Sequence, residues 1–501
     1  MKNELAYQDR IIAKTDGLIS HVGLPLVQFR PVRRAIVRAL TWRTNHNLKR
    51  SRENSKLPPG VEDDRAVMGL ALLRSIERAI GERHLSQGTL DFVSRLLAYL
   101  LVINRSGERR RQDIKARKGF RPPAFLVISP GKACNLHCVG CYADSDKTGE
   151  KISWSTLDRI VTEAEQDWAR NFFVISGGEP LAYRSEGKGI LDLAEKHNRS
   201  FMMFYTNGTL INDEITDRLA RLGNITPAIS VEGWRETTDA RRGAGIFDQV
   251  LATMQRLRQA GVLFGVSLTA TRHNVEEILS EDFIDYLFNQ QQASYGWIFH
   301  YMPIGRSYTL ELMPTPEQRL WMWRRTWEII RQRQIFLADF WNHGTAALGC
   351  LSAGQHDGKG YLYINWKGSV NPCVFVPYSP VNINQVYANG ETLTDAWSDA
   401  FLASIRRWQD GYQRNGGNWM APCIIRDHHA DLRQLIAQYE PDPDDESARQ
   451  ALLDGDYARG MDAYDQAYQA LTKDIWQEYY LREADGHDGH VRPLPELPFL
   501  N

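Results

Sequence analysis

Apolar positions between residues 125 and 302 alternate between short strand-like runs and longer stretches with helical periodicity. Runs rich in β-branched and aromatic residues predict strands at 125–129, 172–176, 201–205, 227–231, 262–269 and 297–302. Apolar residues at helical spacing predict helices at 155–170, 189–197, 213–222, 247–260 and 275–288. This alternation implies right-handed crossovers and a parallel sheet. Six units are fewer than the eight of a closed barrel, so the pattern predicts an α/β fold, a partial (β/α)6 TIM-type barrel.

The first 121 residues are instead predicted to form an α-helical N-terminal region. Val32, Ile36 and Leu40 repeat every four residues, and the positions around them carry arginines: Arg33, Arg34, Arg38 and Arg43. Residues 66–80 and 90–103 show two further helical patterns. The periodicity stops at the basic stretch 105–123, which ends in Pro122 and Pro123, so a linker is predicted there.

Beyond the predicted barrel, the pattern indicates a helix at 316–335, a β-hairpin around residues 366–368, helices at 448–453 and 464–480, and an extended end at 487–501. We therefore expect four parts: a basic helical region at 1–121, the barrel at 122–345, a small cysteine-containing extension at 346–440 and an acidic tail at 441–501.

Charge is segregated along the chain although the 501 residues sum to a net charge of −1. Residues 1–121 carry 25 Lys and Arg against 12 Asp and Glu, and residues 431–501 carry 6 against 16. The basic helix near Trp42 suggests peripheral contact with a membrane surface, a bond to the acidic tail, or docking on the barrel with a solvated basic face. No recognised module accompanies the charge, so nucleic acid is not an expected partner. No bilayer-spanning run or secretory leader is evident, which predicts a cytoplasmic protein, with the membrane surface as the alternative.

Three of the six cysteines, Cys134, Cys138 and Cys141, fall within eight residues directly after the first predicted strand. Three thiolates at this spacing suit three corners of a four-iron cube and leave the fourth iron open. Two other interpretations stay open: one face of a helix, or a zinc site completed by His137. Pro130 and the glycines around the segment favour a loop over a helix.

Further motifs follow the later strands in order: Ser176-Gly177-Gly178-Glu179-Pro180, Thr206-Asn207-Gly208-Thr209, Ser230-Val231-Glu232-Gly233, Arg241-Arg242-Gly243 and Tyr301-Met302-Pro303-Ile304-Gly305-Arg306. Together with the cysteine loop, this series over residues 125–306 resembles the radical S-adenosylmethionine (SAM) superfamily. One position departs from the family pattern. The family usually has an aromatic residue before the third cysteine, whereas here Gly140 precedes Cys141 and Tyr142 follows it.

The resemblance implies a [4Fe-4S] cluster on Cys134, Cys138 and Cys141, and reductive cleavage of SAM to a 5′-deoxyadenosyl radical that abstracts hydrogen from a substrate. The residues that it implies for SAM binding are Gly177, Gly178, Glu179, Asn207, Ser230, Arg242 and Met302. The two glycines permit close backbone approach. Glu179 would accept hydrogen bonds from the methionine ammonium, and Arg242 or Arg241 would hold the carboxylate. Asn207 and Ser230 would be polar contacts, and Met302 would pack on adenine. No catalytic acid or base is identified.

The other cysteines, Cys350, Cys373 and Cys423, lie after the barrel. This region resembles the SPASM or twitch extension of radical SAM maturases, which implies one auxiliary iron–sulfur cluster on the three thiolates. Candidates for a non-cysteine ligand are available close to Cys423: Asp427, His428 and His429. The alternative is three ordinary buried cysteines.

A small electron donor such as flavodoxin or ferredoxin is the expected redox partner. The resemblance suggests a peptide substrate, and hence maturation or cofactor biosynthesis; a membrane lipid or isoprenoid is the alternative substrate. The competing hypothesis from another class is a non-catalytic binding protein that zinc or an inert iron–sulfur cluster stabilises.

Overall fold

The computed structural model describes residues 38, 42, 57–82, 84–93, 105–482 and 492–495. Within the predicted amphipathic segment at 32–43, only Arg38 and Trp42 belong to this part, and both are helical and exposed. The remainder of that segment, residues 94–103 of the second predicted helix and most of the predicted extended end lie outside the described residues. Among the helices described, none has both the length and the apolar character needed to cross a bilayer.

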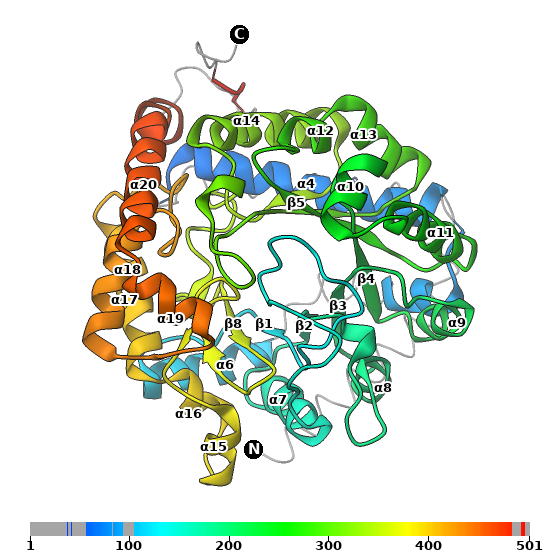
Figure 1. The fold of residues 1–501 in the computed structure, drawn as a ribbon, viewed down its shortest axis with the longest axis horizontal. Helices are drawn as coiled ribbons and strands as arrows, with labels where there is room; N and C mark the ends of the chain where they lie inside the picture. Colours follow the sequence, from blue (N-terminus) through cyan, green and yellow to red (C-terminus); the bar gives the residue numbers. More distant parts are fainter. Residues whose placement is uncertain are drawn as a thin grey trace.

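A curled sheet of parallel strands surrounds the centre of the molecule, with helices packed on its outer face (Figure 1). In space the order is β7-β6-β5-β4-β3-β2-β1-β8-β9, and only the β8–β9 pair is antiparallel. The strands are β1 Phe125–Ile128, β2 Phe172–Ile175, β3 Phe201–Thr206, β4 Ile225–Ser230, β5 Gly265–Ala270, β6 Gly296–His300, β7 Leu337–Asp339, β8 Tyr361–Ile364 and β9 Val370–Asn371. The predicted partial barrel is therefore confirmed, with its six strands as β1 to β6.

Two more parallel strands extend this sheet at its ends. β7 pairs with β6, and β8 pairs with β1 through partners such as Val127 and Tyr363. β8 and β9 form the hairpin predicted around residues 366–368. Because β8 comes from the region beyond residue 345, the cysteine-containing extension contributes a strand to the barrel sheet.

The strands are buried on both faces, which explains their continuous apolar sequences. Leu126 and Phe173 point outward into a core shared with the helices, whereas Val127, Val174 and Met203 point inward into a second core at the centre of the curl. Each fully buried side chain of this size contributes roughly 1.5–3 kcal/mol to folding.

Helices follow the strands as predicted, with local capping signals at their ends. Ser153 caps α7, Asn212 caps α9, and Gly223 ends α9 in the left-handed region. The helices of the barrel are α7 Trp154–Gln166, α8 Ile190–Lys196, α9 Asp213–Leu222, α10 Arg235–Arg242, α11 Ile246–Gln259, α12 Val275–Ile278, α13 Glu281–Asp285 and α14 Pro316–Arg333. The single helix predicted at 275–288 is wrong: α12, α13 and a π-helical turn, η3 Tyr286–Gln290, occupy that stretch. Helix α10 is highly polar and was not predicted.

The linker predicted at 105–123 is also wrong, because helix α6 (Arg105–Lys118) occupies most of it. Its basic side chains are used for docking. Arg110 donates to the carbonyl of Gln166, the last residue of α7 (Trp154–Gln166), Arg111 donates to that of Ala169 just after it, and Ile114 is buried. A helix without an apolar stripe is thus held by tertiary contacts rather than by its own periodicity.

The two ends of the described chain pack together on the barrel. α4 (Pro59–Glu82) contacts α14 and the π-helical turn η6 (Trp476–Leu481). Asp64 is fully buried; it accepts hydrogen bonds from Thr345 and Tyr480, and burial raises its pKa to about 7. Arg492 pairs with Asp63 at 3.2 Å. The described part of the acidic tail is therefore packed against the rest of the fold.

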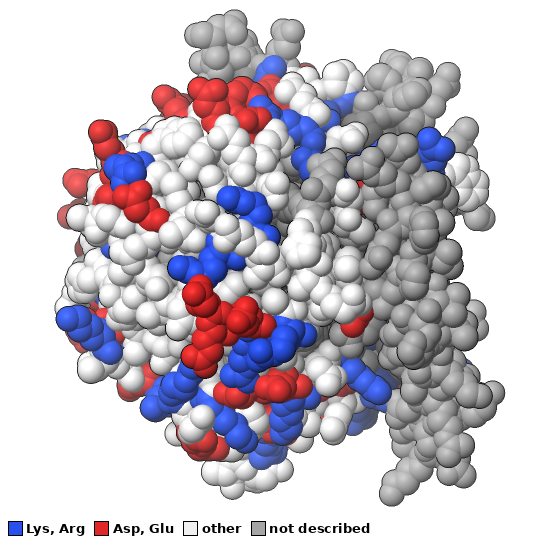
Figure 2. Space-filling model, turned by 90° about the vertical axis from the view of Figure 1, so that its right-hand side faces the viewer, with Lys and Arg blue, Asp and Glu red and all other residues white. Residues whose placement is uncertain are grey.

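The remaining elements cover one side of the barrel in Figure 1. They are β10 Tyr378–Ser379, α15 Ile383–Ala388, α16 Leu393–Trp397, α17 Ala400–Arg414, α18 His429–Tyr439, β11 Asp442–Pro443, α19 Glu446–Leu453 and α20 Gly455–Ile475. The described chain also contains the short 3-10 turns η2 Pro180–Ala182, η4 Leu310–Leu312 and η5 Ser352–Gly354. On the face shown in Figure 2, basic and acidic side chains are interspersed rather than separated.

Candidate active site

The first cysteine group lies in the irregular loop between β1 and α7, as predicted, and not on a helix face. All three side chains are partly exposed. Burial, together with the neighbouring Glu179, Cys138 and Cys141, raises the pKa of the Cys134 thiol to about 11. The thiols are thus close enough to influence one another, and negative charge accumulates when they ionise together.

A second loop, after β6, holds the cysteine loop in place. Arg306 donates to the carbonyls of Cys138 (2.8 Å) and Ser145, and its backbone N–H donates to the carbonyl of Cys141 at 3.0 Å. A Cβ added to the adjacent Gly305 would lie 2.5 Å from the Tyr142 carbonyl carbon. Only a glycine allows these two backbones to approach so closely. Arg306 belongs to the motif after the sixth predicted strand, but its clamping role is visible only in the structure.

The glycines after β2 pack against the cysteine loop. A Cβ on Gly177 would lie 2.5 Å from the Gly131 carbonyl oxygen, and one on Gly178 would lie 2.6 Å from the Ala133 carbonyl carbon. The Gly178 N–H donates to the Gly131 carbonyl at 3.0 Å. Gly177 and Gly178 therefore approach the backbone of residues 131–133 closely, as expected of glycines at these positions.

Glu179 is buried and accepts several hydrogen bonds. Its carboxylate accepts from the Thr206 hydroxyl (2.8 Å) and from the backbone N–H groups of Asn207 (2.9 Å) and Leu181 (3.1 Å). Burial nevertheless raises its pKa, because desolvation outweighs these bonds and the attraction of Arg242. The carboxylate is oriented before any ligand arrives.

The two arginines at the end of α10 meet a buried acid that sequence reasoning had not singled out. Glu232, with no exposed side-chain surface, accepts from Arg241 Nη1 at 2.7 Å and Arg242 Nε at 2.8 Å. Arg242 also lies near Cys138 and Cys141, which help to raise its pKa. Glu232 thus fixes the guanidinium groups beside the cysteine loop.

Asn207, Ser230 and Met302 occupy three different positions around this region. The Asn207 amide donates to Asn135 Oδ1 at 2.9 Å and lies 3.8 Å from Cys134 Sγ. Ser230 is buried at the carboxyl end of β4. Met302 is buried in the inner core just beyond β6.

The aromatic residues around the third cysteine are rearranged relative to the family pattern. Gly140 has φ +63°, and a Cβ there would lie 2.5 Å from the Tyr301 ring. The Tyr301 ring therefore occupies the space that a side chain at position 140 would need. Tyr142 instead points to the glycine motif, with its hydroxyl 2.7 Å from Ser176 Oγ.

The second cysteine group converges although its members are far apart in sequence. The thiols of Cys350 and Cys423 share a hydrogen bond; Cys373 helps to raise the pKa of Cys423, and Cys350 helps to raise that of Cys373. Two hydroxyls contact the group: Ser352 Oγ lies 3.2 Å from Cys350 Sγ, and Tyr361 Oη lies 2.8 Å from Cys373 Sγ. Neither hydroxyl was singled out from the sequence.

The three candidates for a non-cysteine ligand are engaged elsewhere in this structure. Asp427 forms a fully buried pair with Arg319 and accepts from the Cys423 N–H at 3.0 Å. His428 Nε2 contacts the Ala421 carbonyl at 3.0 Å, and His429 lines a separate pocket.

Phe375 connects the two cysteine groups. It follows Cys373 by two residues, and its ring centroid lies 6.2 Å from that of Tyr142, next to Cys141. The same ring lies 4.7 Å from the Trp341 ring. Residues next to both cysteine groups therefore pack in one aromatic region inside the curl of the sheet.

The donor chemistry of both groups fits iron–sulfur ligation, for which thiolates are the usual protein ligands. Each set places three thiols near one another in the fold. In the part of the chain that the structure describes, no three His, Cys, Asp or Glu side chains close around a single metal ion.

Comparisons with known proteins agree with this geometry. A family model described as the Radical SAM superfamily matches residues 128–280. Mycofactocin maturase MftC of Mycolicibacterium smegmatis is 30% identical over 286 residues, covering 54% of this chain and 70% of that protein. AdoMet-dependent heme synthase of Methanosarcina barkeri is 25% identical over 323 residues, covering 59% and 87%. Among solved structures, Streptococcus suis SuiB bound to precursor peptide SuiA matches with a TM-score of 0.49 and 19% identity, covering 61% of this chain and 73% of that one. The chain belongs to the radical SAM superfamily and is an enzyme that uses S-adenosylmethionine with a [4Fe-4S] cluster.

Proposed function

We propose that Cys134, Cys138 and Cys141 bind the [4Fe-4S] cluster at which SAM is cleaved, and that the enzyme modifies a peptide by hydrogen abstraction. When bound, the cluster and SAM supply the 5′-deoxyadenosyl radical. The chain's own residues bind, orient and shield the reactants. The observation that carries the proposal is the contact of Phe375 with Tyr142, because it joins the two cysteine groups across one aromatic region.

Residue roles follow from the fixed geometry around the cysteine loop. Glu179 is held by three donors and would receive the methionine ammonium. Arg242, which shares Glu232 with Arg241, would hold the methionine carboxylate with its remaining donor capacity. Asn207 would contact the polar part of SAM from beside Cys134. Gly177 and Gly178 keep the two loops together.

Further proposed contacts complete the site. Gly177, Gly178, Ser230 and Met302 would line the SAM site, and Cys350, Cys373 and Cys423 would hold one auxiliary cluster. A small protein such as flavodoxin or ferredoxin would deliver the electron. Peripheral membrane contact through residues 32–43 stays a prediction, because most of that segment lies outside the described residues.

The name of one relative, a mycofactocin maturase, supports a maturation reaction of the kind that peptide-modifying enzymes perform. A second candidate substrate is a porphyrin, since the match to the AdoMet-dependent heme synthase covers 87% of that protein. A lipid or isoprenoid is the third class to be tested.

Substrate class is tested with deuterium. Reduced, anaerobically reconstituted enzyme is incubated with SAM and one deuterated substrate at a time, either a peptide, a porphyrin or an isoprenoid. The deuterium content of the 5′-deoxyadenosine formed is then measured. Transfer from a peptide supports the proposal. Transfer only from a porphyrin or an isoprenoid assigns that class instead.

Paired cysteine variants test the two clusters. We expect Cys138→Ala to abolish SAM cleavage. We expect Cys373→Ala to lose about four irons per chain and product formation while still cleaving SAM. Identical behaviour of the two variants in iron content and SAM cleavage would contradict two separate clusters.

A further inference from the structure

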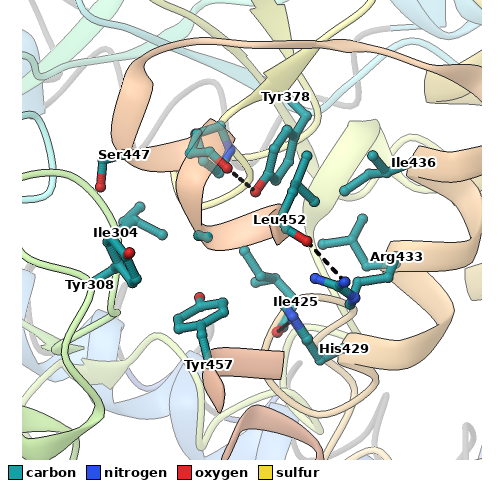
Figure 3. A pocket seen from close by; sticks show the side chains of 14 residues that line it. Ile304, Tyr308, Tyr378, Ile425, His429, Arg433, Ile436, Ser447, Leu452 and Tyr457 are labelled. Carbon is teal, nitrogen blue, oxygen red and sulfur yellow. Dashed lines mark hydrogen bonds between the residues drawn. The ribbon is translucent and has the colours of Figure 1, made fainter. Parts of the chain in front are cut away.

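A narrow pocket lies where the C-terminal helices meet the loop after β6 (Figure 3). Helices α18, α19 and α20 form most of its wall, and the rest comes from Ile304 and Tyr308 of the loop after β6 and from Pro377, Tyr378 and Ile425. Its volume is about 370 Å³ when the space open to solvent is included, and its closed inner part holds little more than one water molecule, so only the end group of a ligand can enter it. Most of the lining side chains are apolar, among them Ile425, Leu432 and Leu452.

Two polar side chains one helical turn apart on α18 reach this pocket with unpaired atoms. His429 is 5% exposed; its Nδ1 contacts the Ile425 carbonyl at 3.1 Å, and its buried Nε2 has no partner. Arg433 Nη2 donates to the Leu452 carbonyl at 3.0 Å, as Figure 3 shows, while its buried Nη1 has no partner. Leaving such a group unpaired costs roughly 1–3 kcal/mol.

The charge of Arg433 is also unbalanced locally. Throughout the described residues, no carboxylate lies within 4 Å of its guanidinium, whereas Arg319 and Arg242 each have such a partner. A positive group facing a small, mostly apolar pocket is suited to a negatively charged end group with a short apolar stem.

We propose that this pocket binds a carboxylate on a short apolar stem, contributed by an acidic side chain or the C-terminus of the substrate peptide. The carboxylate accepts from Arg433 Nη1 and from protonated His429 Nε2, and the apolar wall receives the methylene or methyl groups. The peptide as source rests on the proposed function, whereas the carboxylate chemistry of the pocket does not.

Hydrogen bonds connect the pocket to the cysteine loop through residues 303–306. Ser447 donates to the Gly305 carbonyl at 2.8 Å, and the Tyr457 hydroxyl donates to the Pro303 carbonyl at 3.2 Å. Arg306 of the same segment clamps the carbonyl of Cys138. A ligand in the pocket therefore stabilises the segment that positions the cluster ligands. This gives the substrate a recognition contact away from the reacting atoms.

Binding of short probes tests the site directly on the full-length, anaerobically reconstituted enzyme. Isobutyrate and its uncharged analogue isobutyramide are compared by ligand-observed NMR titration. We expect isobutyrate to bind at least about ten-fold more tightly than isobutyramide, because only the former balances the charge of Arg433. Equal binding of the two probes, or no binding of either, would overturn the proposal.

Variants locate the binding. Arg433→Met should weaken isobutyrate binding about ten-fold or more, and Arg433→Lys, which keeps the charge, should weaken it less. Arg449→Met is the matched control, since Arg449 lies on α19 with a 61% exposed side chain and pairs with Glu446. Thermal unfolding verifies that each variant is folded. An equal loss in the Arg449→Met control would place the binding elsewhere.

The pH dependence of isobutyrate binding gives a second measurement. Burial lowers the pKa of His429 in the free pocket, Arg433 lowers it further and Asp462 opposes this. Tyr308, Tyr378 and Tyr457 are the other titratable groups at the pocket. A bound carboxylate raises the His429 pKa, so isobutyrate affinity should fall as pH rises through the bound-state pKa, and it should fall again at acid pH where isobutyrate itself becomes protonated. His429→Gln should remove this dependence; an unchanged pH profile would contradict the role of His429.

The two proposals fail separately. SAM cleavage without any isobutyrate binding would leave the proposed function standing and remove the pocket assignment. Isobutyrate binding in an enzyme that transfers no deuterium from peptides would keep the pocket and remove the peptide substrate.

Discussion

Replacement of Gly178 by alanine tests the packing between the glycine motif and the cysteine loop. The new Cβ would lie 2.6 Å from the Ala133 carbonyl carbon, with the carbonyl oxygens of Lys132 and Ala133 closer still. Ordinary contact begins at 3.4 Å. The φ angle of Gly178 is not in the left-handed region, so the cost arises from contact and not from backbone strain.

The two loops must move apart by about 1 Å, because backbone on both sides cannot yield by rotating a side chain. Overpacking of this kind costs typically about 1–3 kcal/mol of folding stability. A displacement of about 1 Å between groups that position reactants can lower a rate about 100-fold. We therefore expect Gly178→Ala to remain folded, with a lower melting temperature, and to cleave SAM about 100-fold more slowly.

The assay is formation of 5′-deoxyadenosine by reduced enzyme, with thermal unfolding in parallel. Gly411→Ala is the matched control, because this glycine lies inside α17 and a Cβ added to it would have no other atom within 4 Å. Alanine there should stabilise the helix by about 0.5–1 kcal/mol and leave cleavage unchanged. Wild-type cleavage and stability in Gly178→Ala would refute the reasoning.

Three further predictions concern single buried groups. Glu179→Gln should abolish SAM binding measured by calorimetry. Burial raises the Glu179 pKa, so the rate of SAM cleavage by the wild-type enzyme should drop on acidification with a midpoint above the pKa of an exposed glutamate, about 4.3. A midpoint at or below about 4.3 would contradict this. Arg319→Met should cost about 3–5 kcal/mol in denaturant unfolding because it leaves Asp427 charged, buried and unpaired; a loss below about 1 kcal/mol would argue against the buried pair. Gly140→Ala should lower the free energy of unfolding for two reasons, the φ of +63° at this position and the contact of the new Cβ with Tyr301. In a double-mutant cycle, Tyr301→Ala should remove only the loss that the contact causes. Removal of the whole loss would rule out backbone strain.

Sequence periodicity by itself determined the repeating framework of this protein. Alternating strand and helix patterns predicted β1 to β6. Each strand is buried on both faces and each helix on one, and the spacing of apolar residues along the sequence reflects this burial directly. The loops that carry Cys134, Glu179 and Asn207 were placed at strand ends for the same reason. Their spacing and residue types sufficed for the resemblance to radical SAM enzymes.

Only the tertiary structure decided which distant groups meet. Local patterns do not show that β8 pairs with β1, that α6 is held by carbonyls of the barrel, or that Glu232 binds both arginines. The convergence of Cys350, Cys373 and Cys423, and the engagement of Asp427 by Arg319, likewise depend on contacts between separate elements. Periodicity reports that a side chain is buried but not which partner it is buried against, because the partner is selected by packing of the whole chain.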